Sequence, residues 1–408
     1  MFNGGVGRNI DLYIIAAVVI LCGVGVITIY STLQGSEISM ARNLHLKQLL
    51  WFGLGLFTMV LAAAIPYKAY YALSPIFYII SILSLVLLFG IGRGHTGTNR
   101  WFQFGSFHLQ PAELAKVAAI FILARYLSTR KVASGGIKPF LPALPLVGLP
   151  IILIIKQPDL GTSLVFLAIL VAMLYRAGMR LNDMFLILSP AISLVCAFHL
   201  ASWMVFILVL ILMLLRSRPR FLATAAIFLL NFAVGIGTPI LWRSLHEYQQ
   251  KRILVFLNPG RDPLGAGYQV IQSKVALGSG GVWGKGFLHG TQTKLAFLPA
   301  QHTDFVFSSF GEQFGFWGSL VLLALLLTLI LRGMKIAYMS RNKFAGLMAM
   351  GATAVILFHV IVNVGVSLGI MPVTGLPLPF MSYGGSSLIS NMILVGLLLN
   401  ARFRWQEY

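Results

Sequence analysis

Asp304 directly follows a long hydrophilic stretch, residues 243–302, at the point where the sequence returns to an apolar run. The stretch is mostly basic. Its cations are Arg243, Lys251, Arg252, Arg261, Lys274, Lys285 and Lys294, against the acidic Glu247 and Asp262. A carboxylate placed beside many cations is suited to proton abstraction from a bound anionic substrate. The pattern therefore predicts a base at Asp304 and an anion held next to it.

The chain has ten acidic residues, so those beside apolar runs are informative. Glu113 and Lys116 are three apart and share one face at the start of a predicted helix. Asp159 opens another helix, while Asp304 and Glu312 would lie about 12 Å apart along one face of a third. Ionisable groups at membrane depth usually face a cavity, so these residues are the candidates for function.

Each candidate also has a purely structural interpretation. Asp159 could cap its helix, because a carboxylate accepts free backbone N–H groups. Glu113 and Lys116 could form an ion pair that only orients two helices. Either Thr303 or Asp304 could cap the helix that follows.

Two further features give weaker signals. His302 is better explained as an interfacial polar residue than as a metal ligand, because no second histidine or cysteine stands at ligand spacing. The run from Gly278 to Gly286 resembles a phosphate loop, but Ser279 replaces the first required glycine and Gly286 replaces the Ser/Thr. Its glycines instead predict tight turns and close backbone approach.

The elements that must position these residues are membrane helices. Hydrophobic residues make up 58% of the chain and charged residues 10%, against roughly 45–50% and roughly 25% in soluble domains. A net charge of +20 would suggest nucleic acid in a soluble protein, but most basic residues flank apolar runs, where they act as topology signals. We therefore expect a polytopic membrane protein that binds no nucleic acid. Cys22 and Cys196 lie inside apolar runs, which excludes a disulfide framework.

Long apolar runs predict the membrane spans, judged against the roughly 20 residues that cross a bilayer. They cover residues 12–32, 48–66, 73–92, 112–127, 139–155, 160–176, 183–200, 203–216, 221–242, 304–331, 344–370 and 382–401. With both termini cytoplasmic, more than half of the thirty basic residues face inward, as the positive-inside rule expects. The other basic residues gather mainly in the outer loops 93–111 and 243–302, which predicts a ligand there. Arg216 to Arg220 is an inner signal that favours three crossings between 183 and 242. We predict one domain, residues 1–408.

Ordered motifs along the chain resemble the RodA branch of the SEDS family. These motifs are Asn99-Arg-Trp101, Gln110-Pro-Ala-Glu-Leu-Ala-Lys116, Gln157-Pro-Asp-Leu-Gly-Thr-Ser163, Asp262-Pro-Leu-Gly-Ala-Gly-Tyr-Gln269, Ile271-Gln-Ser-Lys274, Gly284-Lys-Gly286, His289-Gly-Thr-Gln292, Phe297-Leu-Pro299, His302-Thr-Asp-Phe305 and Pro377-Leu-Pro-Phe-Met-Ser-Tyr-Gly-Gly-Ser386. The resemblance spans residues 10–402, and its His289-Gly-Thr-Gln292 segment favours RodA over the division relative FtsW.

The resemblance implies a peptidoglycan glycosyltransferase for cell elongation and shape. Such an enzyme polymerises lipid II, a disaccharide-pentapeptide on undecaprenyl pyrophosphate, at the outer face of the plasma membrane. The essential aspartate of the family maps onto Asp304, and Trp101, Glu113, Lys116 and Asp159 match other family positions. The implied partners are a class B penicillin-binding protein transpeptidase and other membrane proteins of the elongation complex.

The resemblance also implies an all-α bundle of about ten spans, so residues 203–242 are interpreted as an added helix pair, giving twelve. Because the number of added spans is even, every later segment of the chain stays on the same side of the membrane. One departure from the family is Glu312-Gln313, where relatives often have two glutamates. This difference puts in doubt a carboxylate role at position 313.

Glycan extension by a sugar hydroxyl requires a base, whereas the diphosphate leaving group requires charge neutralisation. One carboxylate plus cations is therefore sufficient, unlike the carboxyl pair of a glycosidase. Asp304 is expected to take the proton from the acceptor GlcNAc 4-hydroxyl, with inversion from an α-linked donor to a β-1,4 product. A divalent cation, Mg or Mn, could help to neutralise the charge of the diphosphate, although the sequence contains no recognisable set of ligands dedicated to such an ion. The expected substrate-binding residues are Arg100, Trp101, Glu113, Lys116, Asp159, Lys274, His302 and Thr303.

Two other classes fit the same composition. A lipid II flippase would also have outward cations and intramembrane carboxylates. A scaffold of the cell-wall complex would require neither, and its function would be insensitive to loss of Asp304.

Overall fold

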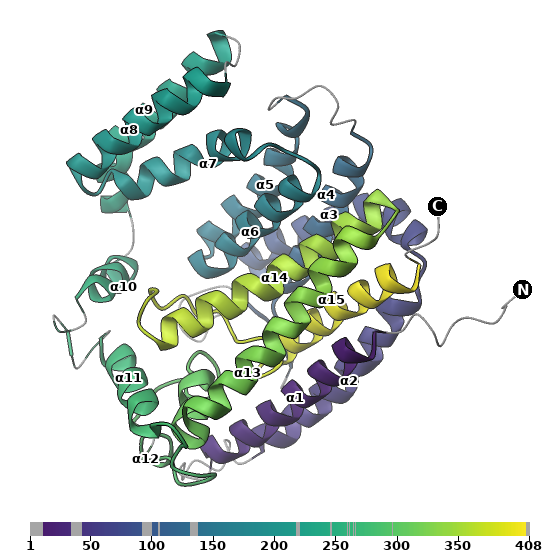
Figure 1. Ribbon diagram of the computed structural model, residues 1–408, viewed down its shortest axis with the longest axis vertical. Coiled ribbons are helices and arrows are strands. Elements are labelled where there is room, and N and C mark those ends of the chain that lie inside the picture. Colours follow the sequence, from purple (N-terminus) through teal and green to yellow (C-terminus); the bar gives the residue numbers. More distant parts are fainter. Residues whose placement is uncertain are drawn as a thin grey trace, which may run out of the picture.

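The computed structural model describes residues 11–33, 43–91, 100–104, 107–130, 138–217, 221–244, 247–258, 260, 262–263, 265, 267–295 and 297–404. It is a helical bundle (Figure 1), and each of the twelve predicted apolar runs coincides with a helix. These helices are α1 (Leu12–Leu33), α2 (Leu44–Ala64), α3 (Tyr67–Ile91), α4 (Pro111–Ser128), α5 (Ala143–Lys156), α6 (Leu160–Arg176), α7 (Leu181–Cys196), α8 (Leu200–Ser217), α9 (Phe221–Ser244), α13 (Val306–Met339), α14 (Lys343–Ser367) and α15 (Gly385–Phe403), with a short 3-10 helix η3 (Lys138–Phe140) before α5.

Eight helices of the described residues are long and apolar enough to cross a membrane. Helices α5, α6 and α7 are shorter, and α4 carries Glu113, Lys116 and Arg125 within its 18 residues. The chain is therefore a multi-pass membrane protein, as predicted, while the number of twelve spans stays a prediction. Helix α8 has 18 residues, longer than the apolar run from 203 to 216 suggested. Part of the inner-face signal that motivated this assignment, residues 218–220, lies outside the described residues, as does Asn99.

The core of the bundle surrounds α14, which packs against α4, α6, α13 and α15. Small residues on α14 allow this close packing, as is common between membrane helices. A Cβ atom added to Gly351 would lie 2.9 Å from Ile120 of α4 and 2.9 Å from the Met173 sulfur of α6. Helix α14 thus holds the helices that carry the candidate residues.

The bundle has two distinct ends, which the antiparallel pair α1 and α13 defines. At one end, Asp11 before α1 pairs with Arg332 of α13 at 3.6 Å. At the other, Ser31 donates to the Gln313 side chain at 2.7 Å. We call the second end, which holds residues 300–305, the loop end, and the first, which holds the α13–α14 connection at residues 340–342, the turn end (Figure 1).

Much of the predicted outer loop 243–302 is helical rather than irregular. It contains α10 (Glu247–Leu257), α11 (Tyr268–Gly280) and α12 (Thr291–Lys294). The loop 93–111 contains an unpredicted hairpin of β1 (Phe102–Phe104) and β2 (Phe107–Leu109), antiparallel to each other. Ser386, at the start of α15, joins the hairpin by donating to the His108 carbonyl at 2.7 Å. Both segments therefore belong to the loop end.

The glycine-rich run makes the close backbone contact that its composition predicted, and makes it at an unpredicted break in α13. Gly315 interrupts α13 with φ +65°. Around the break, the N–H groups of Lys285 and Gly286 donate to the carbonyls of Glu312 and Gln313, both at 3.0 Å. A side chain at Gly284 would collide with the Gln313 carbonyl. The run is a close backbone contact and not a phosphate loop.

The helix pair α8–α9 packs on α7 and stands apart from the central helices in Figure 1. It shares a small core with α7, formed by Leu186 of α7 and by Phe206, Leu210 and Leu214 of α8. Asn231 of α9 connects it to α7 by donating to Ser189 at 2.8 Å, and such polar contacts between helices stabilise packing in lipid. This arrangement fits the interpretation of residues 203–242 as an added pair.

Candidate active site

The turn that carries Asp304 is fixed by the irregular segment between α14 and α15, residues 368–384, which we call the central segment. The hydroxyl of Ser382 donates to the Thr303 carbonyl at 2.6 Å, and the Tyr383 N–H donates to the His302 carbonyl at 2.8 Å. Gln48 of α2 donates to the Ser382 carbonyl at 3.2 Å. Non-helical backbone at this depth requires such partners, because lipid supplies none.

Asp304 lies in this turn and not in the helix. Helix α13 begins at Val306, and its cap residue Phe305 has no side-chain capping bond among the described residues. The capping interpretation of Thr303 and Asp304 is therefore wrong, and so is the predicted helix start at 304. The expected shared helix face with Glu312 is also wrong. The Asp304 carboxylate therefore does not cap the helix, which is the structural role that most often explains an acidic residue at a helix start.

The surroundings of Asp304 raise the pKa of its carboxyl group. The largest cause is burial, which desolvates the charged form, and the nearby charge of Asp159 raises the pKa further. Opposing these, the positive charge of Arg252 and a hydrogen bond from Thr303 lower it. The residue itself remains partly accessible. A partly accessible carboxylate whose pKa is moved toward neutral pH is suited to act as a general base.

The backbone behind Asp304 is held by Asn363 of α14. The Asn363 side chain donates to the Asp304 carbonyl and to the Leu376 carbonyl of the central segment, both at 2.9 Å. Gly375 faces the carboxylate, because a Cβ atom at this position would lie 3.9 Å from Asp304 Oδ2. Since Gly375 has φ +76°, a conformation that favours glycine, a side chain is excluded next to the carboxylate.

A cavity of about 240 Å³ opens beside this turn, between α10, α11 and the central segment. Arg252 enters its wall and donates to the Val373 carbonyl at 3.2 Å. The lining residues are Lys251, Arg252, Val255, Phe256, Gln269, Val270, Met371, Pro372 and Val373. Two cations above an apolar floor would suit a diphosphate with a hydrocarbon tail. A larger cavity lies at the turn end, remote from Asp304.

Asp159 caps α6, as the structural interpretation expected. Its carboxylate accepts from the Thr162 N–H at 3.1 Å and from the Thr162 hydroxyl at 2.9 Å. Gln110 donates to the same carboxylate at 3.4 Å, and Arg100 donates to the carbonyl of Gln157 at 3.1 Å and to that of the next residue. The cap thus brings the charge of Asp159 close enough to affect Asp304, and it brings Arg100 to the same loop.

Glu113 and Lys116 lie in the core, where they form a charged cluster with His359 of α14. The Lys116 ammonium is 2.8 Å from a Glu113 carboxylate oxygen and 3.3 Å from His359 Nε2, and all three side chains are buried. The Glu113 carbonyl accepts from Ser390 of α15 at 3.2 Å. Buried charges require such pairing. The ion-pair alternative is the one that this geometry favours, because the Lys116 ammonium is enclosed.

The remaining expected residues also lie at the loop end, where Lys274 and Trp101 are exposed and His302 and Thr303 are half-buried. Lys274 is exposed and packs against Gly369 of the central segment. Trp101 has an exposed fraction of 36%. Burial lowers the pKa of His302, so its imidazole is neutral at neutral pH and does not counter the charge of Asp304. The described residues contain no group of three His, Cys, Asp or Glu side chains that could hold a metal ion.

Glu312 has a role that the sequence did not predict. Its carboxylate is buried and accepts from the N–H groups of Gln292 and Thr293, at 2.9 and 3.1 Å, and from the Thr293 hydroxyl at 2.7 Å. The Lys285 ammonium lies 3.0 Å away. Glu312 therefore anchors α12 and the glycine-rich run to α13. The small number of acidic residues in the chain drew attention to Glu312, but only the fold identifies its hydrogen-bond partners.

Comparison with known proteins gives consistent matches along the chain. A family model described as a cell cycle protein, for FtsW, RodA and SpoVE, matches residues 12–203 and 183–406. The peptidoglycan glycosyltransferase MrdB of Escherichia coli K12 is 38% identical over 368 residues, covering 90% of this chain and 86% of that protein. The peptidoglycan glycosyltransferase RodA of Treponema pallidum is 33% identical over 425 residues, covering 97% and 98%.

A solved structure matches the fold as well. A chain from a peptidoglycan synthase complex, described as coordinating polymerization and crosslinking, superposes with a TM-score of 0.72 at 30% identity. The match covers 98% of this chain and 99% of that chain.

Proposed function

Because the chain belongs to the FtsW/RodA/SpoVE family of cell cycle proteins, we propose that it is a peptidoglycan glycosyltransferase that polymerises lipid II. The observation that carries the proposal is the position of Asp304. Its carboxylate sits in a turn at the loop end, makes no helix cap among the described residues, and lies in surroundings that raise its pKa. A flippase or a scaffold requires no such base.

In the proposed reaction, the Asp304 carboxylate takes the proton from the 4-hydroxyl of the acceptor sugar. The hydroxyl oxygen forms a bond to the anomeric carbon of the donor, and the bond from that carbon to the diphosphate oxygen breaks. The diphosphate leaves with the bonding electron pair, so no acid is required to protonate it. Inversion at the anomeric carbon gives a β-1,4 linkage from an α-linked donor.

The cations of the loop end are proposed to hold the departing diphosphate. Arg252 and Lys251 line the cavity beside Asp304, and Arg100 and Lys274 are further cations of this end. Cations placed where negative charge develops stabilise the transition state. A divalent cation bound by the diphosphate would supply further neutralisation, since the described residues contain no group of three carboxylate, histidine or cysteine ligands for one.

Three expected contact residues are given other roles in this proposal. Glu113 and Lys116 are proposed as positioning residues, because their buried cluster fixes α14 and hence Asn363, which holds the Asp304 backbone. Thr303 is proposed to act by its hydrogen bond to the carboxylate. Trp101 and His302 remain candidates for sugar contacts at the loop end.

The test compares purified parent, Asp304→Asn, Asp304→Ala and Glu247→Gln in lipid II polymerisation with a class B penicillin-binding protein present. Glu247 is an exposed acid of the same loop, so its variant is the matched control. Loss of a general base typically costs about 10²–10⁴-fold, so both Asp304 variants should fall by that amount while Glu247→Gln keeps its rate.

The fold of the Asp304→Asn variant should be intact. The burial that raises the Asp304 pKa penalises the charged form, so the neutral amide is expected to unfold at the same temperature as the parent or higher. Polymerisation by Asp304→Ala at the parental rate would refute the role of Asp304 as the base. Absence of polymerisation by the parent would refute the enzyme proposal and favour a flippase or a scaffold.

The finer assignments follow from the same proposal. We propose that the loop end faces outward and that both termini are cytoplasmic, in the bacterial plasma membrane. The proposed partners are a class B penicillin-binding protein and other membrane proteins of the elongation complex. Support comes from the matched chain, which belongs to a complex of polymerization and crosslinking.

A further inference from the structure

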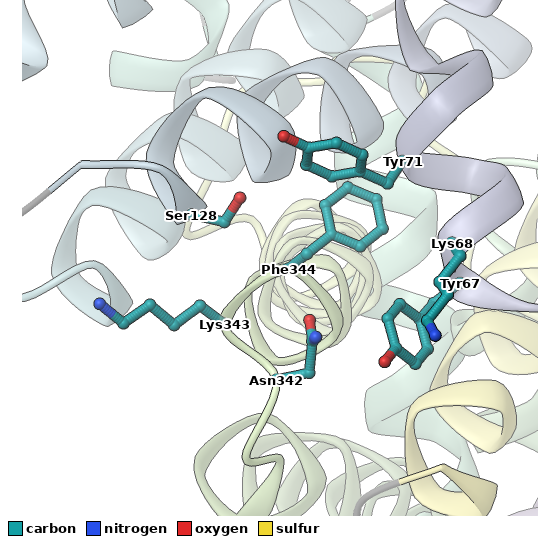
Figure 2. Close-up of a pocket in the computed structure, with 7 residues that line it drawn as sticks. All are labelled: Tyr67, Lys68, Tyr71, Ser128, Asn342, Lys343 and Phe344. Carbon is teal, nitrogen blue, oxygen red and sulfur yellow. The ribbon is translucent and has the colours of Figure 1, made fainter. Parts of the chain in front are cut away.

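A cavity of about 330 Å³ lies at the turn end of the bundle, remote from Asp304. It forms where α3 begins, α4 ends and α14 begins (Figure 2). Because three membrane helices begin or end here, the cavity lies where the apolar layer meets the polar headgroups. The lining residues are Tyr67, Lys68, Tyr71, Ser128, Asn342, Lys343 and Phe344.

The charged groups of this cavity are both positive. Lys68 and Lys343 are exposed and lie on opposite sides of the cavity in the view of Figure 2. Neither ammonium group forms an ion pair with a described acidic side chain, and no acidic residue is among the described residues that line the cavity. Two cations without a counterion attract an anion, and phosphate is one that lysine commonly binds.

The floor of the cavity is aromatic and rigid. The rings of Tyr71 and Phe344 pack edge to face with centroids 5.4 Å apart. The guanidinium of Arg125 lies 4.9 Å from the Tyr71 ring centroid and donates to the Tyr71 carbonyl at 3.0 Å. Arg125 thus holds the Tyr71 ring in place, and the half-buried Tyr71 ring offers an aromatic surface to the apolar part of an interfacial molecule.

The start of α14 adds a third element to the same cavity. The Asn342 side chain caps the helix by accepting from the Ala345 N–H at 3.2 Å. Other N–H groups of this first turn lie beside Lys343, and the first turn of a helix favours negative charge. The lysines flank the cavity on opposite sides, and the aromatic floor and the helix start lie between them (Figure 2).

We propose that this cavity binds the phosphate headgroup of an anionic phospholipid from the adjoining leaflet. The lysines and the start of α14 hold the phosphate, and the Tyr71 ring, backed by the buried Phe344 ring, contacts the glycerol and the first acyl carbons. Basic pockets between membrane helices bind lipid headgroups in this way. A free phosphate shares the charge chemistry but makes no use of the aromatic floor or of the position at the membrane surface.

The test measures lipid retention on the purified full-length protein by native mass spectrometry, with phosphatidylglycerol and phosphatidylcholine as the two probes. The parent should retain phosphatidylglycerol preferentially. The variant Lys68→Gln/Lys343→Gln should bind it more weakly by about fivefold for each lysine. The matched control is Lys335→Gln/Arg216→Gln, which removes two exposed cations away from the cavity and should retain the lipid as the parent does.

Two further arms separate the possible explanations. Ser128→Phe fills the cavity but keeps both lysines, so it should also lose phosphatidylglycerol if the cavity itself is the site. Inorganic phosphate at millimolar concentration should not displace the lipid; displacement would assign the cavity to a soluble phosphate and overturn the proposal. Equal retention by parent and Lys68→Gln/Lys343→Gln, or equal loss by the matched control, would overturn it as well.

Discussion

At the scale of single residues, Asp304 is placed between charges of opposite sign. Arg252 favours its ionised form, while Asp159 and burial favour the protonated form. A base works only when deprotonated, so the polymerisation rate should fall as the pH drops through the Asp304 pKa. The neighbours of Asp304 therefore set the acidic limit of activity.

This arrangement predicts two opposite shifts in the pH profile of kcat/KM. Arg252→Gln removes a charge that lowers the Asp304 pKa, so the acidic inflection should move to higher pH. Asp159→Asn removes a charge that raises the pKa, so the inflection should move to lower pH, while asparagine can still cap α6.

Lys251→Gln is the matched control for the pH profile, because Lys251 is the neighbouring cation on α10 but is not among the charges that act on Asp304. Its inflection should stay near that of the parent. If Arg252→Gln and Asp159→Asn moved the inflection in the same direction, the base would not be Asp304.

The sequence identified Asp304 because a carboxylate beside a basic loop and an apolar run is uncommon. It did not identify His359 or Asn363, which are polar residues four apart in an apolar run. Their importance depends on which face of α14 meets α4 and which meets the central segment. That orientation is set by packing between distant segments and is not encoded in local spacing.

At the scale of elements, the contact between the glycine-rich run and the break in α13 holds the loop end together. Gly284→Ala should destabilise the protein, because Gly284 has φ +82° and an added Cβ would collide with the Gln313 carbonyl. The φ penalty alone is roughly 1–2 kcal/mol. Gly278→Ala is the matched control: it lies in α11 with open space around it and should stabilise by about 0.5–1 kcal/mol.

Thermal unfolding of the two purified variants measures this difference, with opposite signs expected for the unfolding temperature. A Gly284→Ala protein as stable as Gly278→Ala would show that the run is not held against α13.

Long apolar runs predicted the membrane helices well, since burial in lipid requires a continuous apolar stretch. The helices α10 to α12 and the β1–β2 hairpin were not predicted. They are short, and their stability comes from contacts such as those of Glu312 with Gln292 and Thr293. The start of α13 was misplaced by two residues because Asp304 is held by the central segment and not by a helix cap.

At the scale of the whole molecule, the proposed topology places the loop end outside and the turn end inside. We expect a cysteine at Lys294, an exposed position of α12, to react with a membrane-impermeant maleimide in intact cells. A cysteine at Lys335, exposed near the turn end, should react only after permeabilisation. Each cysteine is introduced into a variant from which the two native cysteines, Cys22 and Cys196, have been removed. Reversed labelling would place Asp304 inside and refute the proposed reaction.

The order of helices followed from the sequence, but their arrangement did not. Nothing in the apolar runs distinguishes α8 and α9 from the central helices. Their separation on α7 follows from polar contacts such as Asn231 with Ser189 and from the small core around Phe206. These contacts join segments that are distant in the chain, and local pattern does not report them.

Helix α14 carries both His359, in contact with the enclosed Lys116, and Asn363, which bonds the Asp304 carbonyl one turn away. If this helix slid or rotated by a single step, it would separate His359 from the Lys116 ammonium and release the reactive turn at once. Helix α14 thus fixes the position of the turn that carries Asp304. The opposite wall of the cavity is formed by α10 and α11, so the position of the reactive turn and the shape of the cavity depend on different helices.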